Sequence, residues 1–387
     1  MSVQELAVED LQEERILLSP PDVGQAEEDA VAAAVKSAWV APLGPYVDRF
    51  EAEMAEFIGA PAGFSCAALS SGTAGLELAL RLGGTKPGDW VLVPTKTFVA
   101  SANAVVQAGA RPMFVDADPA TWNLDNDIAL SVLESAKRAN NLPSAVMLVD
   151  LYGTCTDHSE LMTWCAEHDV AVVKDAAEAV GSSHDDVSAG LVGDIGVFSF
   201  NGNKIMTTSG GGMLVGPSDV MTRARWLASQ AREPGDRYLH LEQGFNYRLS
   251  SILAALGCAQ LARLPEMIER RRNVRREYAN AFVDGLGLAL NPVADINATN
   301  CWLTVLELPP GFHPSVVAEQ LDAYGIEVRR SWFPMHQQPL FMNHAYYGAG
   351  VADSIFERAI CLPSGSAMSQ RDIDRVISAV YSVLGHQ

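Results

Sequence analysis

Short runs of apolar residues alternate, between about residues 60 and 215, with stretches whose apolar positions recur at helical spacing. Seven of these runs predict β-strands: Cys66–Leu69, Trp90–Val93, Pro112–Val115, Ala145–Val149, Val170–Val173, Ile195–Phe200 and Met213–Val215. Apolar strands separated by helices are typical of a mostly parallel sheet covered on both faces. We therefore expect an α/β fold in which a ligand binds beyond the carboxyl ends of the strands.

The rest of the chain predicts a second, smaller domain. A helical pattern over residues 250–278 contains Pro265, which would kink one helix or begin another. Apolar runs and helical stretches alternate again further on, as in an α+β domain. Because 387 residues exceed what one hydrophobic core usually supports, two domains are expected. We predict a large domain with a seven-stranded sheet over residues 25–265 and a small C-terminal α+β domain over 266–387, with the segment 1–24 packing nearby.

Composition narrows the class of protein. The net charge is -20, from 27 Lys and Arg against 47 Asp and Glu, so the chain lacks the positive field that nucleic acid or an anionic membrane requires. The acidic N-terminus does not resemble a signal peptide, and no apolar run reaches the ~18 residues of a membrane span. The six cysteines are widely spaced without a Cys-x-x-Cys pair, which favours reduced thiols. We expect a cytoplasmic protein without a metal site.

Three motifs at predicted strand ends suggest a phosphate-bearing cofactor that reacts with an amine. Lys204 follows a strand and the turn-prone residues 201–203, Asp175 comes directly after another strand, and Ser71-Gly72-Thr73 lies between a strand and a helix. Pyridoxal phosphate needs an amine to form a Schiff base, an anion to keep its ring nitrogen protonated, and a donor-rich turn for its phosphate. One sheet could bring these three motifs together.

Each motif also has an ordinary structural interpretation. Ser71-Gly72-Thr73 matches a helix N-cap, and Asp175 with Glu178 matches a capping box. Lys204 alone would be a solvated loop lysine. The combination and order of the three favour the cofactor.

Four motifs in order resemble those of the DegT/StrS family of pyridoxal-phosphate-dependent sugar aminotransferases, and the resemblance covers nearly the whole chain. They are Ser71-Gly72-Thr73, Asp175-Ala176-Ala177-Glu178, Ser199-Phe200-Asn201-Gly202-Asn203-Lys204 and Gly244-Phe245-Asn246-Tyr247-Arg248. The resemblance implies a fold-type-I aminotransferase. In it, Lys204 would be the Schiff-base lysine and general base, and Asp175 the partner of the pyridine nitrogen.

The same resemblance implies the other cofactor contacts. The phosphate would lie at Ser71, Gly72, Thr73 and Ser199, the ring of Phe98 would stack on the cofactor, and Glu178 would lie near the cofactor ring. Asn246 would reach the cofactor phosphate of a partner subunit, which implies a homodimer with shared sites.

The form of the Lys204 motif is most similar to the branch that aminates UDP-linked 4-keto-6-deoxy-N-acetylhexosamines. This implies transfer of an amino group from L-glutamate to the 4-keto carbon, a step in deoxy amino sugar and glycan biosynthesis. Asn203, Arg330 and His336 are the candidate substrate contacts. Another nucleotide-linked ketosugar, a cyclitol substrate and a cofactor-binding regulator without turnover remain open.

Two further residues have open roles. Lys96 stands where an apolar or aromatic residue is common in the family, so it would either meet an anionic part of a substrate or point to solvent. Trp302 is expected in the core rather than against a ligand.

Overall fold

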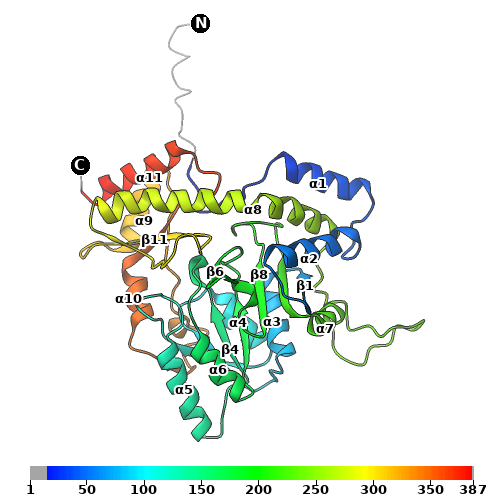
Figure 1. Cartoon of the computed structure of the whole chain (residues 1–387). Helices are drawn as coiled ribbons and strands as arrows, with labels where there is room; N and C mark the ends of the chain where they lie inside the picture. The colour runs from blue at the N-terminus through cyan, green and yellow to red at the C-terminus, as the bar shows by residue number, and fades with distance from the viewer. Residues whose placement is uncertain (1–14, 386–387) are drawn as a thin grey trace.

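The computed structural model describes residues 15–385 and shows the expected α/β architecture (Figure 1). A large sheet has the strand order β1-β9-β8-β5-β4-β2-β3-β13. Its strands are β1 (Phe64–Leu69), β2 (Trp90–Pro94), β3 (Arg111–Val115), β4 (Ala145–Val149), β5 (Ala171–Asp175), β8 (Ile195–Ser199), β9 (Gly212–Pro217) and β13 (Tyr346–Tyr347). Strand β9 runs antiparallel to β1 and β8, and the other neighbouring strands are parallel.

All seven predicted strands are confirmed, with small shifts at their ends, but the sheet has eight strands rather than seven. The additional strand, β13, pairs with β3 in parallel. It is only two residues long and comes from the C-terminal part of the chain. A strand this short has no recognisable apolar run, and only tertiary contact brings it to the sheet edge.

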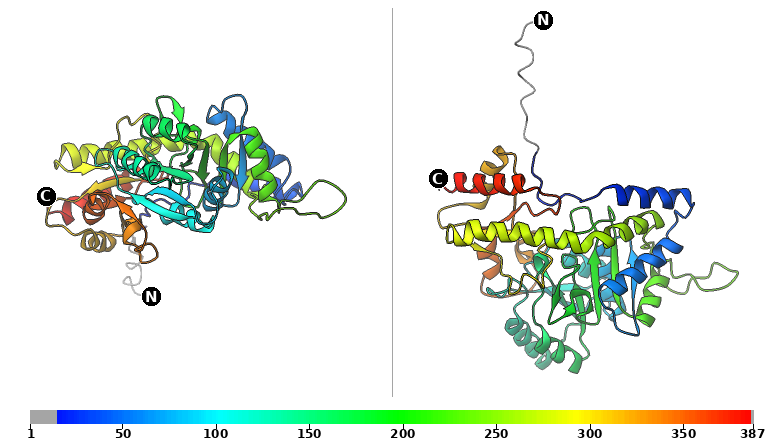
Figure 2. Two further views of the ribbon diagram at one scale, coloured as in Figure 1. Left: turned by 90° about the horizontal axis from the view of Figure 1, so that it is seen from below. Right: turned by 45° about the horizontal axis from the view of Figure 1, so that its top comes forward.

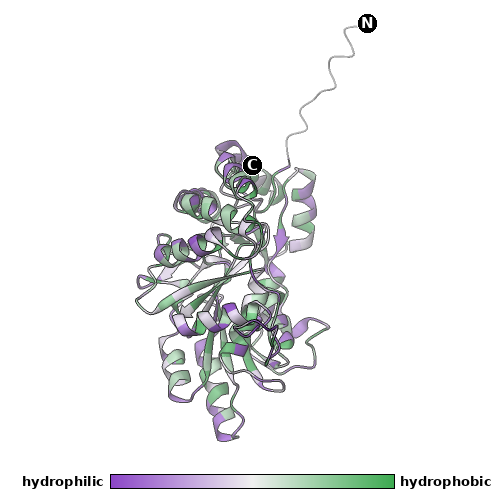
Figure 3. Ribbon diagram, turned by 90° about the vertical axis from the view of Figure 1, so that its right-hand side faces the viewer, coloured by the Kyte–Doolittle hydropathy of each residue, from purple (hydrophilic) through white to green (hydrophobic). Residues whose placement is uncertain are grey.

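Alternate side chains of the central strands enter two separate hydrophobic cores. On β4, Met147 belongs to a core with helices α3 (Gly72–Leu82), α4 (Val99–Gln107) and α7 (Ser218–Ala228). Its neighbours Val146 and Leu148 belong to a core with α5 (Asn126–Arg138) and α6 (Ser159–Glu167). Figure 3 shows mostly green strands inside and purple segments on the outer helices. Helices therefore cover both faces of the sheet, as the sequence predicted.

A second, antiparallel sheet lies in the C-terminal part of the chain, with the order β10-β11-β14-β12. Its strands are β10 (Ala289–Leu290), β11 (Thr304–Glu307), β12 (Arg329–Arg330) and β14 (Ala359–Leu362), and the nearby helices are α9 (Pro314–Ala323), α10 (Val351–Arg358) and α11 (Gln370–Val383). The N-terminal segment joins this region, because Ile16 bridges to Ile326. Residues 1–14 of the predicted N-terminal segment lie outside the described residues.

Helix α8 (Ser251–Tyr278) links the two sheets. Its first half packs on α1 (Gln25–Lys36) and α2 (Pro45–Phe57), and its last turns enter the core of the small sheet. Pro265 lies inside this continuous 28-residue helix, so it does not begin a second helix. The helix crosses the predicted domain boundary at 265, which stays a prediction. Figure 2 shows this helix crossing much of the length of the molecule, with the long loop after α7 projecting at the right of both views.

The remaining elements are short: η1 (Leu151–Gly153), β6 (Ser183–His184), β7 (Val187–Ser188), η2 (Ala189–Leu191), η3 (Ala279–Asp284) and η4 (Met335–Gln337). Across residues 15–385, no helix has the length and apolarity to span a membrane. The same residues contain no group of three or more His, Cys, Asp or Glu that could hold a metal ion. All six cysteines are free.

Candidate active site

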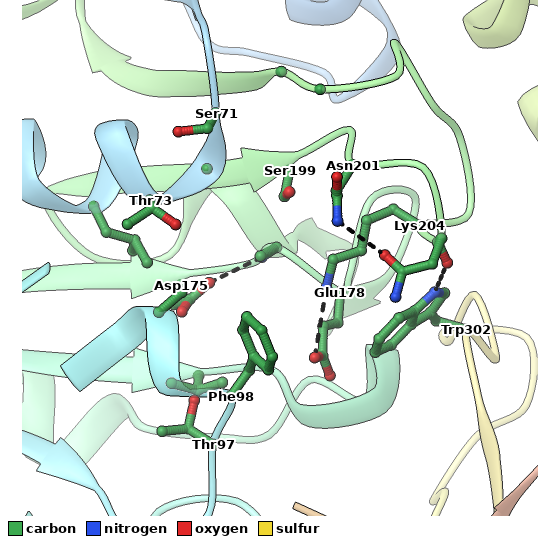
Figure 4. Close-up of a pocket in the computed structure, with 18 of the residues that line it drawn as sticks. Ser71, Thr73, Thr97, Phe98, Asp175, Glu178, Ser199, Asn201, Lys204 and Trp302 are labelled. Atoms are coloured by element: carbon green, nitrogen blue, oxygen red, sulfur yellow. Dashed lines mark hydrogen bonds and ion pairs between the residues drawn. The ribbon is translucent and has the colours of Figure 1, made fainter. Parts of the chain in front are cut away.

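A cavity of about 270 Å³ lies at the carboxyl ends of strands β2, β4, β5 and β8 (Figure 4). This is where ligands bind in open α/β sheets. Every predicted cofactor contact except Asn246 lines it: Ser71, Gly72, Thr73, Phe98, Asp175, Glu178, Ser199 and Lys204. The aromatic side chains of Trp302 and Trp332 complete the opposite wall.

One end of the cavity is built to hold an anion. Ser71 has extended backbone and its hydroxyl accepts a hydrogen bond from the Ala74 N–H at 3.1 Å, so it caps α3. A Cβ added to Gly72 would lie 2.9 Å from the Cβ of Ser199, so only glycine lets Ser199 approach this closely. The helix N-terminus, with Thr73 and Ser199 beside it, fits a phosphate. The N-cap interpretation of Ser71 and the anion-site interpretation therefore both hold.

Asp175 ends β5 and is buried, with 5% exposed. Its carboxylate accepts hydrogen bonds from the Ser101 hydroxyl at 2.7 Å and the Ala177 N–H at 3.1 Å. Burial raises its pKa, and these two hydrogen bonds oppose that shift. The amines of Lys204 and Lys174 also lower its pKa, but no cationic side chain of residues 15–385 lies within ion-pairing distance, so the carboxylate faces the cavity without an ion-pair partner. A protonated ring nitrogen would satisfy it.

The capping-box interpretation of Asp175 is wrong. No helix begins after β5, where the chain makes a turn instead. Glu178 does not cap a helix either, because one of its carboxylate oxygens accepts a hydrogen bond from the Tyr152 N–H at 2.6 Å. Neither carboxylate is used to cap a helix, so both can contact a ligand in the cavity.

Lys204 reaches the cavity from the loop after β8. Its amine lies 3.6 Å from the other carboxylate oxygen of Glu178 and 4.0 Å from the centroid of the Trp302 ring. Burial raises the pKa of Glu178, and the nearby amine lowers it. The indole N–H of Trp302 donates to the Asn203 carbonyl at 2.8 Å, and the Ser19 hydroxyl donates to the same oxygen at 2.8 Å. The ring and the N-terminal segment thus hold the lysine loop in place.

Trp302 corrects an expectation. It is 1% exposed, as a core residue would be, yet it also lines the cavity under the Lys204 amine. Sequence reasoning also missed Ser101, the hydrogen-bond donor to Asp175. Ser101 lies on α4, and only the tertiary structure, which brings its hydroxyl to the end of β5, reveals its role.

A second cavity, of about 480 Å³, adjoins the first and shares Phe98, Asn203, Trp302 and Trp332 with it. Arg330, a predicted substrate contact, lines this second cavity. Its guanidinium lies 3.6 Å over the Phe356 ring, and its Nε is buried without a hydrogen-bond partner in residues 15–385.

The structure does not bring His336 to the site. Its Nδ1 is 2.7 Å from the Thr95 hydroxyl, and its ring stacks on Tyr346 with 3.7 Å between centroids. His336 lines neither of the two adjoining cavities. The Pro-rich loop therefore contributes Trp332 to the site, whereas its histidine packs against the edge of the large sheet.

Asn246 also lies outside its own cavity. It is exposed and follows the loop that projects after α7 (Figure 2). That loop carries the exposed side chains of Tyr238, Leu239 and Leu241. A role for Asn246 in a cofactor site therefore requires a second copy of the chain.

The cavity lining fits pyridoxal phosphate in three separate places. Lys204 supplies the amine, Asp175 an uncompensated buried carboxylate, and the N-terminus of α3 a phosphate cradle that a Cβ at Gly72 would crowd. The lining thus combines all the groups that the cofactor requires.

Comparisons with known proteins agree with this geometry. Residues 21–381 match the DegT/DnrJ/EryC1/StrS aminotransferase family. EpsN of Bacillus subtilis, by name a pyridoxal phosphate-dependent aminotransferase, is 44% identical over 95% of both chains. GDP-perosamine synthase of Caulobacter vibrioides is 34% identical over 96% of this chain and 98% of its own. The crystal structure of the aminotransferase TlmJ from Streptoalloteichus hindustanus superposes with a TM-score of 0.87 at 31% identity, covering 96% of this chain and 99% of that one.

The match extends along nearly the whole chain, and it includes the residues that form the cavity. The chain therefore belongs to the DegT/DnrJ/EryC1/StrS family and is a pyridoxal-phosphate-dependent sugar aminotransferase.

Proposed function

We propose that the protein transfers an amino group from L-glutamate to the 4-keto carbon of a UDP-linked 4-keto-6-deoxy-N-acetylhexosamine. The main support is the second cavity, which adjoins the cofactor cavity and shares Phe98, Asn203, Trp302 and Trp332 with it. A sugar ring in the shared region would lie beside Lys204, and a nucleotide would extend into the larger space. The free cysteines suit a reducing compartment such as the cytoplasm.

The chain's own groups divide the chemistry. Bound pyridoxal phosphate supplies an electron-accepting ring. Asp175 keeps the ring nitrogen protonated, because a buried carboxylate favours a cationic partner. Lys204 anchors the cofactor and then moves a proton as a general base. The Glu178 carboxylate lies 3.6 Å from the Lys204 amine and helps to orient it in the cavity.

Arg330 supports a phosphate-bearing acceptor. It brings a guanidinium to the wall of this cavity, where one terminal nitrogen lies 3.4 Å from the Glu357 carboxylate and donates to the Phe356 carbonyl at 3.1 Å. Its buried Nε has no hydrogen-bond partner within residues 15–385. An arginine can bind a diphosphate through two parallel hydrogen bonds. The choice of UDP over GDP rests on the resemblance of the Lys204 motif, since GDP-perosamine synthase is also similar to this chain.

We further propose a homodimer in which Asn246 of one copy completes the site of the other. The exposed apolar side chains Tyr238, Leu239 and Leu241 on the projecting loop support such a contact. Mixing Lys204→Ala and Asn246→Ala proteins tests this, because one site of each mixed dimer would regain both residues. Activity well above that of either parent protein is expected. Mixed dimers that are no more active than the parents would contradict a shared site.

The substrate is tested with a panel of UDP-, GDP- and dTDP-linked 4-ketosugars. The enzyme is given pyridoxal phosphate and L-glutamate, and mass spectrometry with NMR identifies the product and the aminated carbon. Amination of the UDP-linked N-acetylhexosamine with the highest kcat/KM is expected. A higher kcat/KM for a GDP or dTDP sugar would refute the UDP assignment, and no turnover of any acceptor would favour a regulator.

A further inference from the structure

Lys96 is buried in a place that neither expectation foresaw. Its side chain lies just before the cavity residues Thr97 and Phe98, yet it is 1% exposed and lines neither cavity. Its amine donates a hydrogen bond to the Ser331 hydroxyl and lies 5.5 Å from the Trp122 ring. Within residues 15–385, no carboxylate lies within ion-pairing distance of it. Lys96 therefore neither points to solvent nor meets a substrate directly.

Burying this amine destabilises the fold. Burial lowers the pKa of Lys96 to about 7, which measures how strongly the site disfavours the charged form. The titratable groups around it are the Cys361 thiol, Arg358, Glu178, Glu307 and the Tyr152 hydroxyl, and none of them neutralises it by contact. An apolar side chain would avoid this cost. An amine that is buried at an energetic cost beside an active site suggests a functional role for the residue.

The Lys96 hydrogen bond joins two segments that each carry one ring of the cavity wall. Phe98 lies two residues after Lys96 in the large domain, and Trp332 directly follows Ser331 near the small sheet. The rings of Phe98 and Trp332 are 5.6 Å apart, and both line both cavities. We call these two rings the aromatic wall. Trp332 is also stacked on Tyr152, with 5.9 Å between centroids.

We propose that Lys96 is a positioning residue. Through its hydrogen bond to Ser331 it holds the aromatic wall in the geometry that contacts the cofactor ring on one side and the acceptor on the other. The contact with the cofactor requires only the established family chemistry, whereas the contact with the acceptor rests on the proposed function. Lys96 then contributes to binding at the expense of stability.

The substitution Lys96→Met separates these two effects, because methionine keeps the length of the side chain but removes the amine. Between the folded pKa of about 7 and the unfolded value of 10.5, the unfolded chain binds a proton that the folded chain does not. The stability of the native chain therefore rises with pH over this range. Lys96→Met should raise the urea midpoint, more at about pH 6 than at about pH 9.

The same variant should bind pyridoxal phosphate at least about fivefold more weakly, because the aromatic wall loses the hydrogen bond between Lys96 and Ser331. Ser331→Ala removes the acceptor, so it should weaken cofactor binding as well while lowering stability. In the double variant, Ser331→Ala should add no further weakening. Lys86→Met is the control, since it makes the same substitution at an exposed lysine that lines neither cavity and should leave the cofactor dissociation constant unchanged.

Two results would overturn the proposal. One is a cofactor dissociation constant that is unchanged in Lys96→Met. The other is a Ser331→Ala substitution that raises this dissociation constant by the same factor whether or not Lys96 is present. If Lys96→Met fails to fold, Ser331→Ala alone decides through the same dissociation constant. Neither readout uses a sugar, so a failure of the proposed substrate assignment would leave both intact. With an active acceptor, Lys96→Met should raise KM more than it lowers kcat.

Discussion

The two faces of strand β5 differ in whether a buried charge has an ion-pair partner. Lys174 and Asp175 are neighbours, so their side chains point to opposite faces of the sheet. The Lys174 amine meets the Asp150 carboxylate at 2.5 Å, and both side chains are fully buried. Asp175 meets a hydroxyl and a backbone N–H but no cation. A charge that belongs to the fold is neutralised within the chain, whereas a charge that serves a ligand is left for the ligand to neutralise.

This difference has an energetic reason. A buried charge costs several kcal/mol unless it is paired, so an unpaired one persists only where a partner arrives or a function requires it. The raised pKa of Asp175 reflects that cost before the cofactor binds. Lys96 is an intermediate case, with a hydroxyl partner and no counter-charge.

The largest expected effect is the loss of turnover when Lys204, which lies in the same cavity as Asp175, is replaced. Lys204→Ala should lower turnover by more than about 10³-fold, because it removes both the cofactor anchor and the general base. Steady-state kinetics and the visible absorbance of bound cofactor measure this. Lys86→Ala, at an exposed lysine, is the matched control and should be unaffected. Turnover that survives in Lys204→Ala would refute the assignment.

The next effect concerns the paired face of β5. Lys174→Met should lower the free energy of unfolding by ~3–5 kcal/mol, because it leaves Asp150 buried and unpaired. Urea denaturation of the cofactor-free protein measures it, with Lys86→Met expected to change stability by less than about 0.5 kcal/mol. A small loss in Lys174→Met would show that the Asp150 pair is not structural.

The unpaired face should respond in the opposite sense. Asp175→Asn removes an uncompensated charge, so the stability of the cofactor-free protein should hold or rise. Its affinity for pyridoxal phosphate should fall about tenfold or more, because a charge-assisted hydrogen bond becomes a neutral one. Equilibrium titration with the cofactor tests this. If the variant loses stability and keeps its affinity, Asp175 serves the fold.

The smallest effect is in the pH dependence. The folded pKa of Asp175 is raised above 3.8, so the folded chain retains a proton that the unfolded chain has lost. This contribution lowers stability as pH rises from about 4 through the raised pKa. The stability of Asp175→Asn relative to the native chain should therefore increase over that window and then level off. Urea midpoints measured across this window test it, and a constant difference would contradict the buried, uncompensated state.

The sequence alone predicted seven of the eight strands of the large sheet, because these depend on local apolar patterns. Its motifs, together with the family resemblance that they carry, predicted eight of the residues that line the cavity. Apolar runs of three to six residues mark the buried strands. Residues such as Ser71, Asp175 and Lys204 directly follow strands or turns, and the carboxyl ends of parallel strands meet at one edge. Local order therefore places them together.

Tertiary structure decided which buried groups meet across long separations. Lys96 finds Ser331 at a separation of 235 residues, and Thr95 finds His336 at 241. The direction of these side chains depends on how segments far apart in the sequence pack against one another, and no local pattern encodes that packing. For this physical reason the sequence did not predict that Trp302 lines the cavity, that His336 lies outside it, or that Lys96 is buried against Ser331.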